Sequence, residues 1–183
     1  MSKTGALLRH LKSIRDHRPV VHNIANQVAT EWCANALLAV GASPLMSDEP
    51  NEFDDIARFA SALVVNIGTL NMRQIDTIYG ACRCAQEHDI PIVLDPVGAG
   101  ATRLRLTVSL KILNEFRPTI VRGNHTEIAS LTTEQTLSFS GVDGDSLPDA
   151  ARDAAKLAKR YDAIVCSTGK EYWVADPNRL CLL

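Results

Sequence analysis

The stretch VLDPVGAGAT, residues 93–102, decides how the rest of the sequence is interpreted. It begins as an apolar run of the kind that forms a buried strand. The run ends on Asp95, and Pro96, Gly98 and Gly100 follow directly. A carboxylate after a buried strand, followed by backbone with few side chains, indicates a tight turn or a place where a ligand approaches the main chain.

Four other apolar runs have the same character, and longer segments with helical periodicity lie between them. Strands are expected at residues 19–24, 62–69, 91–98, 119–124 and 163–169. Helices are expected at residues 28–41, 72–89, 107–116 and 147–162. The alternation of strands and helices predicts an α/β fold with a mostly parallel central sheet that is covered by helices on both faces.

Two other segments depart from this alternation. Residues 141–148 form a polar cluster that is the best candidate for a long loop. Residues 172–183 are predicted to form a strand, a turn and a second strand, with Asp176, Pro177 and Asn178 in the turn. The second strand would present apolar side chains and unpaired backbone at the end of the sequence. We therefore expect the domain to be incomplete at its C-terminus.

The composition restricts the class of protein. The chain has 183 residues, of which 46 % are hydrophobic, and a formal net charge of −2. These values predict one domain, residues 1–183, with a substantial core. A charge near zero gives no electrostatic reason to expect nucleic acid or an anionic membrane as a partner. Residues 1–19 lack the apolar block of a signal peptide, so a cytoplasmic protein is expected.

The cysteines do not indicate a disulfide framework or a zinc site. They are Cys33, Cys82, Cys84, Cys166 and Cys181. Their number is odd and their spacing irregular, and no Cys/His cluster has the spacing of a structural zinc site. Ordinary buried or half-buried thiols are therefore expected.

Polar residues gather where the predicted strands end. In open parallel sheets, ligands bind beyond the carboxyl ends of the strands. The polar or small residues at these ends are Asn23, Asn26, Asn66, Gly68, Thr69, Asp95, Gly98, Gly100, Arg122, Asn124, Glu127, Ser167, Thr168 and Gly169. This set suits a phosphorylated ligand with a divalent metal. Asp95 and Glu127 are the candidate Mg²⁺ ligands, Arg122 would hold phosphate oxygens, and Thr168 would donate its hydroxyl to them.

Each of these residues also has an explanation without a ligand. Asp95 suits an N-cap or a turn, and Arg122 suits a surface salt bridge. Asn124 and Glu127 have the spacing of an ordinary capping box. Residues 168–170 do not form a P-loop, because the upstream glycine is missing, and the glycine-rich turn is not a dinucleotide fingerprint. The joint position at successive strand ends favours the ligand site.

Several longer blocks together are similar to one known family. They are HNIANQVATEWCANALLAVGASPLM, LVVNIGTL, IPIVLDPVGAGATRLR, RPTIVRGNHTEIASL and CSTGKEYWVAD. In this order they resemble hydroxyethylthiazole kinase of the thiamin pathway, from about His22 to Asp176. The DPVGxGAT and RGNxxEIxxL blocks together are specific. Related ribokinase-like enzymes share the general scheme, and the early H-x-I-x-N-x-V and GASPxM blocks favour the thiazole kinase.

The resemblance implies a three-layer α/β/α ribokinase-like kinase. Members of the family transfer the ATP γ-phosphate to the hydroxyl of 4-methyl-5-(2-hydroxyethyl)thiazole with Mg²⁺, and form homotrimers with active sites between subunits. By resemblance, the thiazole-pocket positions are Asn26, Val28, Met46 and Gly68, the ATP-phosphate positions are Arg122 and Thr168, and the acids near Mg²⁺ are Asp95 and Glu127.

The sequence also departs from the family pattern. Ala25 stands where the family usually has threonine, before Asn26. The family continues with a glycine-rich G-T-G-C segment whose cysteine is implied as the base, and nothing here matches it. Cys181 lies in an apolar strand and is no substitute, so the catalytic residue is unassigned and little turnover is expected from residues 1–183.

Two other functions are compatible with these residues. One is a non-catalytic remnant that binds thiazole or nucleotide, since the early pocket residues are retained. The other is a different ribokinase-like activity, such as hydroxymethylpyrimidine kinase or a hydrate dehydratase, although the GASPLM block at residues 41–46 argues against it.

Overall fold

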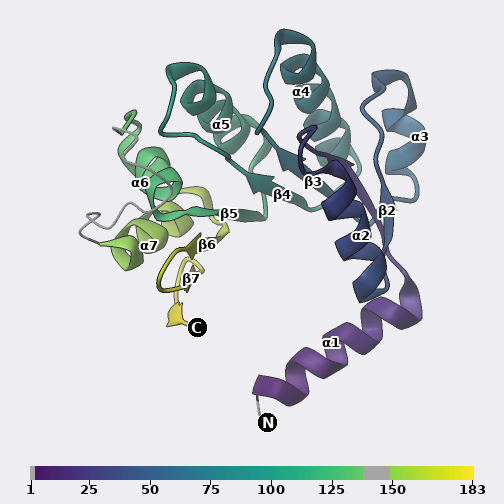
Figure 1. Cartoon of the computed structure of the whole chain (residues 1–183), viewed down its shortest axis with the longest axis horizontal. Helices are drawn as coiled ribbons and strands as arrows, with labels where there is room; N and C mark the ends of the chain where they lie inside the picture. The colour runs from purple at the N-terminus through teal and green to yellow at the C-terminus, as the bar shows by residue number, and fades with distance from the viewer. Residues whose placement is uncertain (1–2, 138–148) are drawn as a thin grey trace.

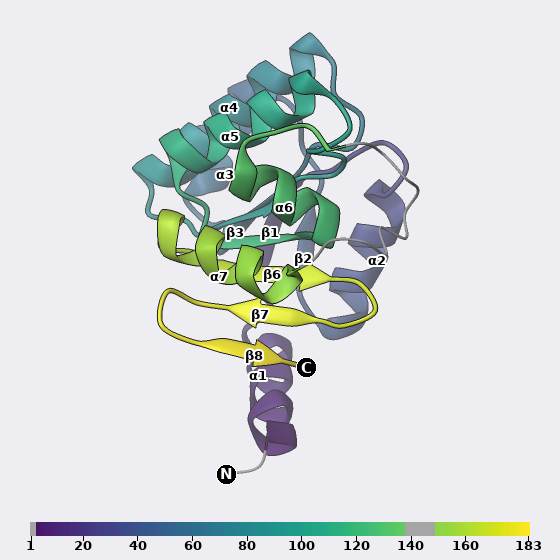
Figure 2. The ribbon, with the colours of Figure 1, turned by 90° about the vertical axis from the view of Figure 1, so that its left-hand side faces the viewer.

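The computed structural model describes residues 3–137 and 149–183, and this part of the chain is built around one sheet. The strand order is β2-β1-β3-β4-β5-β6-β7-β8 (Figure 1 and Figure 2). The strands are β1 (Val20–Ile24), β2 (Ser43–Leu45), β3 (Ala62–Asn66), β4 (Ile92–Asp95), β5 (Ile120–Asn124), β6 (Ile164–Thr168), β7 (Trp173–Ala175) and β8 (Leu180–Leu182). Strands β1 to β6 pair in parallel, and β7 and β8 add an antiparallel edge (Figure 2).

The helices occupy the connections between the parallel strands. They are α1 (Lys3–His17), α2 (Thr30–Val40), α3 (Phe53–Ala57), α4 (Met72–Glu87), α5 (Arg103–Phe116), α6 (His125–Thr133) and α7 (Ala150–Tyr161), with a 3₁₀ turn η1 (Pro50–Glu52). The connection from β1 to β2 crosses the sheet in the opposite direction to all later ones. Because such crossovers are right-handed, α2 lies on one face and α3 to α7 on the other, as Figure 1 shows for α2, α3, α4 and α5.

The core lies between the sheet and the α3–α7 layer. One row of paired residues, Val65, Leu94, Val121 and Val165, crosses four strands and is fully buried. Helix residues that include Ile78 complete this cluster. We call the side of the sheet that carries this row the covered face.

The opposite side is more open where it crosses β5 and β6. Arg122 pairs in register with Cys166, and both alternate with the buried row. Arg122 is exposed, Cys166 is half-buried, and Ile164 on the same face keeps 40 % of its surface exposed. We call this side of β4, β5 and β6 the open face.

The sequence-based prediction of the fold is largely confirmed. All five predicted strands and the terminal hairpin are present, with ends within three residues of the expected ones. The prediction missed α1, α3 and β2, and it gave no range for α6, of which only the capping-box spacing of Asn124 and Glu127 was recognised. Strand β2 has only three residues, one of them a proline, so its sequence gives a weak signal for a strand. The proline is tolerated because β2 lies at the edge of the sheet. The predicted loop at residues 141–148 lies outside the described residues.

Among the described residues, the search for a helix that is long and apolar enough to cross a membrane found none.

Candidate functional site

A ladder of polar side chains links the carboxyl ends of three strands. Asn26, in the turn after β1, donates its Nδ2 to Oδ1 of Asn66 at 2.8 Å. Asn66, the last residue of β3, donates its own Nδ2 to Oδ2 of Asp95 at 2.6 Å. Asn66 and Asp95 are register partners at the ends of neighbouring parallel strands, which is why these side chains meet. The ladder fixes the orientation of the Asp95 carboxylate.

Arg122 and Thr168 belong to the same end of the sheet as Asp95. Asn124 pairs with Thr168, so Thr168 ends β6 beside the end of β5. Its Oγ1 donates to the carbonyl oxygen of Gly123 at 3.2 Å. Burial raises the pKa of Asp95, while the nearby Arg122 charge and the hydrogen bond from Asn66 oppose that rise. The site therefore joins an exposed cation with a partly desolvated carboxylate.

Glu127 lies in the first turn of α6 and closes a capping box. Its Oε2 accepts from the backbone N–H of Asn124 at 2.7 Å, and the Asn124 side chain accepts from the N–H of Glu127 at 2.9 Å. The ordinary capping box that the spacing of Asn124 and Glu127 indicated is thus present in the structure. Burial nevertheless raises the pKa of Glu127, against the effect of its two N–H donors, and Asp95 adds to the rise. Asp95 and Glu127 are therefore close enough at the carboxyl edge of the sheet for the charge of Asp95 to raise the pKa of Glu127.

The glycines of the opening stretch serve the turn itself. Gly98 has φ +70°, a left-handed conformation that favours glycine. Its N–H donates to Oε1 of Glu127 at 2.8 Å, which ties the turn after β4 to α6. A Cβ on Gly100 would overlap the Ser130 side chain, so this glycine permits close packing against the same helix. These contacts support the tight-turn explanation, and they place the Glu127 carboxylate against the turn.

Arg105 is a residue that the sequence interpretation missed. From the first turn of α5, its guanidinium donates to three carbonyl oxygens: those of Ile67, Gly68 and Val97, at 2.6 to 2.8 Å. It therefore fastens the loop after β3 to the loop after β4. A cation is unfavourable in the first turn of a helix because of the helix dipole. Arg103 is in the same position relative to the dipole, so the sequence alone does not distinguish Arg105.

A cavity of about 340 Å³ lies beside this ladder. Its lining includes Met46, Asn23, Gln27, Asp48 and Arg73. Of the four residues that the resemblance assigns to the thiazole pocket, Met46 is part of this lining.

The other three residues are arranged next to it. Asn26 and Gly68 touch, and a Cβ on Gly68 would come within 2.7–2.9 Å of the Asn26 side chain, so only glycine fits there. Val28 lies in the turn before α2 with 80 % of its surface exposed. Asn26 holds this turn through its Oδ1, which accepts from the N–H groups of Val28 and Ala29, each at 2.9 Å.

The donor set of the site has a specific chemical capacity. Carboxylate oxygens are the ligands that Mg²⁺ prefers, and each carboxylate oxygen of Asp95 and Glu127 has more than one lone pair. A guanidinium and a hydroxyl suit phosphate oxygens. The residues present therefore fit a magnesium ion with an attached phosphate group. A mostly parallel α/β sheet with polar and charged groups at its carboxyl edge is the architecture of the ribokinase-like class.

Comparison with known proteins gives the family. The model of the hydroxyethylthiazole kinase family matches residues 11–183. The chain belongs to this family. It is 42 % identical to hydroxyethylthiazole kinase of Brachyspira hyodysenteriae, over 95 % of this chain and 66 % of that protein. The chain spans about two thirds of the length of the curated relatives it matches.

Solved structures agree with the fold. Hydroxyethylthiazole kinase from Pyrococcus horikoshii OT3 superposes with a TM-score of 0.88 and 38 % identity, covering 98 % of this chain and 66 % of that one. Pyridoxal kinase from Staphylococcus aureus, in complex with pyridoxal, has a TM-score of 0.65 at 14 % identity, covering 90 % and 71 %. The second likeness shows the fold alone. The predicted α/β fold and family are confirmed.

Proposed function

We propose that the protein transfers the γ-phosphate of ATP to the hydroxyl of 4-methyl-5-(2-hydroxyethyl)thiazole, in the route to thiamin. The observation that carries this proposal is the gathering of Asp95, Arg122, Glu127 and Thr168 at the carboxyl edge of the sheet. The cavity that Met46 lines lies at the same edge, beside β1 and the start of α4. Family membership supplies the substrate.

In this proposal, the carboxylates of Asp95 and Glu127 hold Mg²⁺, in part through its water ligands. The ion supplies neutralisation of phosphate charge when bound. Arg122 holds phosphate oxygens on the open face, and Thr168 donates its hydroxyl to them. Asn66 keeps the Asp95 carboxylate oriented through its 2.6 Å hydrogen bond. The catalytic base is not assigned to any residue.

The thiazole ring is proposed to lie between Met46 and the Asn26–Gly68 contact. Met46 offers an apolar, adaptable surface for the ring. Because Gly68 has no side chain, its backbone packs directly against the Asn26 amide, and the two residues would form the opposite wall of the ring site. This would place the hydroxyethyl arm toward the Asp95 end of the ladder.

A homotrimer is proposed as the assembly. Helix α2 buries none of its own side chains within the described residues, and Trp32 keeps 78 % of its surface exposed. Val28 directly before it is also exposed. Adjacent exposed apolar residues of this size favour an interface, because water contact with them is costly. A second subunit on α2 would bring Val28 into the pocket that the family resemblance implies.

The test measures ADP release with the thiazole alcohol, on the chain extended through the family's G-T-G-C segment. We expect thiazole-dependent turnover that requires Mg²⁺ and falls at least about 100-fold in Asp95→Asn, since loss of one oriented electrostatic group costs 10²–10³ in rate. Asp55→Asn, an exposed acid paired with Arg58, is the matched control and should be unaffected. Turnover of another alcohol but not of the thiazole would contradict the substrate.

The chain of residues 1–183 is expected to bind the thiazole with little turnover. Calorimetry with the thiazole alcohol checks this separately. A folded chain that shows no heat of binding would contradict the pocket assignment, whereas binding without turnover in the extended protein would favour a non-catalytic binding role.

A further inference from the structure

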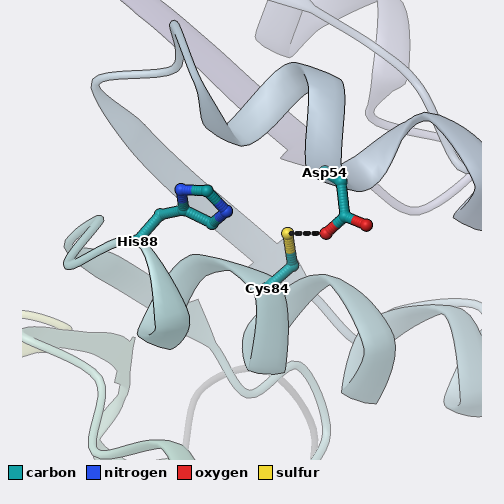
Figure 3. Close-up of side chains that lie close together, drawn as sticks. All are labelled: Asp54, Cys84 and His88. Carbon is teal, nitrogen blue, oxygen red and sulfur yellow. Dashed lines mark hydrogen bonds between the residues drawn. The ribbon is translucent and has the colours of Figure 1, made fainter.

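Three side chains with metal-ligating atoms meet far from the kinase site. They are Asp54 on α3, Cys84 in the last turns of α4, and His88, which caps the end of α4 (Figure 3). One ligand atom from each, a carboxylate oxygen, the sulfur and a ring nitrogen, lies within 4.8 Å of the other two. Figure 3 shows all three side chains directed into the space between the two helices.

The local sequence explains the arrangement. Cys84 and His88 are four residues apart on α4, so they lie on one face of the helix one turn from each other. Phe53 and Ile56 on α3 pack into the same core as Ala81 and Ala85 on α4, which brings the two helices together. Asp54, next to Phe53, is thereby held at the rim of that contact. The third group therefore comes from a segment 30 residues earlier in the chain.

The spacing of sulfur and oxygen agrees with shared coordination. The Cys84 Sγ donates a hydrogen bond to Oδ1 of Asp54 at 3.4 Å. In a tetrahedral zinc site with Zn–S near 2.3 Å and Zn–O near 2.0 Å, the two ligand atoms lie about 3.5 Å apart. A metal ion could therefore replace the thiol proton between them with little movement. The His88 ring is exposed, and its nitrogen lies within 4.8 Å of both the sulfur and the carboxylate oxygen.

We propose that Asp54, Cys84 and His88 form a zinc site with water as the fourth ligand. A thiolate, an imidazole and a carboxylate suit Zn²⁺, while Mg²⁺ and Ca²⁺ prefer oxygen ligands alone. On binding, the thiol proton of Cys84 passes to solvent and the sulfur forms the bond to zinc, so one proton is released per ion. Asp54 and Glu87 are the charged groups that act on Cys84, and both are acidic. Their field favours a cation.

The position of the site separates it from the kinase site. Helix α4 begins at the carboxyl end of β3 and ends before β4 starts. The three residues therefore lie at the end of the sheet opposite to Asp95, and the inference does not rest on the proposed kinase function. A zinc ion there would link α3 to α4. In its absence, burial and the Asp54 hydrogen bond raise the pKa of Cys84 to about 11, so the thiol stays protonated.

The test titrates the purified, metal-free chain with Co²⁺, a spectroscopic substitute for Zn²⁺, and then displaces it with Zn²⁺. We expect one ion per chain, a thiolate-to-cobalt charge-transfer band, and a higher Tm with zinc. His88→Gln and Asp54→Asn, both at exposed residues, should each weaken zinc binding by at least about 10-fold, since even outer-shell partners are worth 10–100-fold. Cys84→Ser should abolish the charge-transfer band.

The controls are Cys181→Ser and His17→Gln, at exposed residues far from the site in sequence, and Asp55→Asn, at the exposed neighbour of Asp54 that pairs with Arg58. They should leave the affinity and the band unchanged. Circular dichroism establishes that each variant is folded, and because Cys84 is buried, the two exposed-ligand variants decide the outcome if Cys84→Ser unfolds. The proposal is overturned if the metal-free chain takes up no Co²⁺, or if His88→Gln and Asp54→Asn bind zinc as tightly as the unchanged chain.

Discussion

The covered face and the open face of the sheet use the same strands for different purposes. On the covered face, Val65, Leu94, Val121 and Val165 form a fully buried row. One residue further along β5, Arg122 is exposed on the open face. Because strand side chains alternate between faces, a single strand can supply core and ligand groups at adjacent positions. Stability and ligand binding are thus separable by mutation in this fold.

The largest effect is expected from a cavity in the covered face. Leu94→Ala removes a fully buried side chain from the middle of the row and should lower the free energy of unfolding by about 2–5 kcal/mol. Ile164→Ala on the open face starts from a side chain that is 40 % exposed, so its cost should be clearly smaller. Urea unfolding of both variants measures the difference. Equal costs would mean that the two faces are equally buried in solution.

The next largest effect is expected at Arg105, which links α5 to the loops after β3 and β4 at the carboxyl edge of the sheet. Arg105→Met keeps much of the apolar stem but removes the donors to three carbonyl oxygens. We expect a loss of about 1–3 kcal/mol in unfolding free energy, because partly buried acceptors lose their partner. Thiazole binding should weaken as well, since the Gly68 loop is released. Arg103→Met, in the same turn of α5, is the control, and an equal loss there would refute the specific role of Arg105.

The smallest expected effect is a pH dependence of the unfolding free energy that arises from His22 on the covered face. His22 packs against Phe53 with ring centroids 5.5 Å apart, and its Nε2 hydrogen-bonds to the carbonyl oxygen of Ser47 at 2.9 Å. Burial lowers the pKa of His22, although the bond to Ser47 and the charge of Glu52 oppose this. The unfolded chain then binds more protons than the folded one as the pH falls below about 6.5. Stability should therefore decline from that pH downward.

The check compares unfolding free energies at pH 7.5 and pH 5.5 for the unchanged chain and for His22→Gln. The unchanged chain should lose more stability over this interval than the variant, by much less than the cost of Leu94→Ala. If His22→Gln shows the same decline, the pH dependence arises from other groups and His22 is not held neutral by burial.

The sequence predicted most of the sheet because its information is local. Apolar runs bounded by proline, glycine and polar residues identify strands such as β3 and β4 without knowledge of their neighbours. The position of Asp95 and Arg122 at one edge followed from the parallel arrangement alone. The roles of these residues as metal and phosphate ligands stay predictions.

Other features depend on contacts between residues that are far apart in the sequence, which local patterns do not predict. Arg105 reaches the Gly68 loop, 37 residues earlier, through side-chain length and helix position. Asp54 meets Cys84 only because α3 packs on α4, so the search for Cys/His spacing did not find the cluster. Strand β2 is defined by pairing with β1 rather than by its own composition. Tertiary packing decided each of these.

Asp95, Arg122, Glu127 and Thr168 are proposed to bind one magnesium–triphosphate group at the carboxyl edge of the sheet. Calorimetric titration of the chain with the Mg²⁺ complex of a non-hydrolysable ATP analogue tests it, with Arg122→Ala against Arg58→Ala, another exposed arginine. We predict Mg²⁺-dependent binding that Arg122→Ala weakens by about 1.5–3 kcal/mol, roughly 10- to 150-fold, with unfolding free energy unchanged. Equal affinity in both variants would contradict the account.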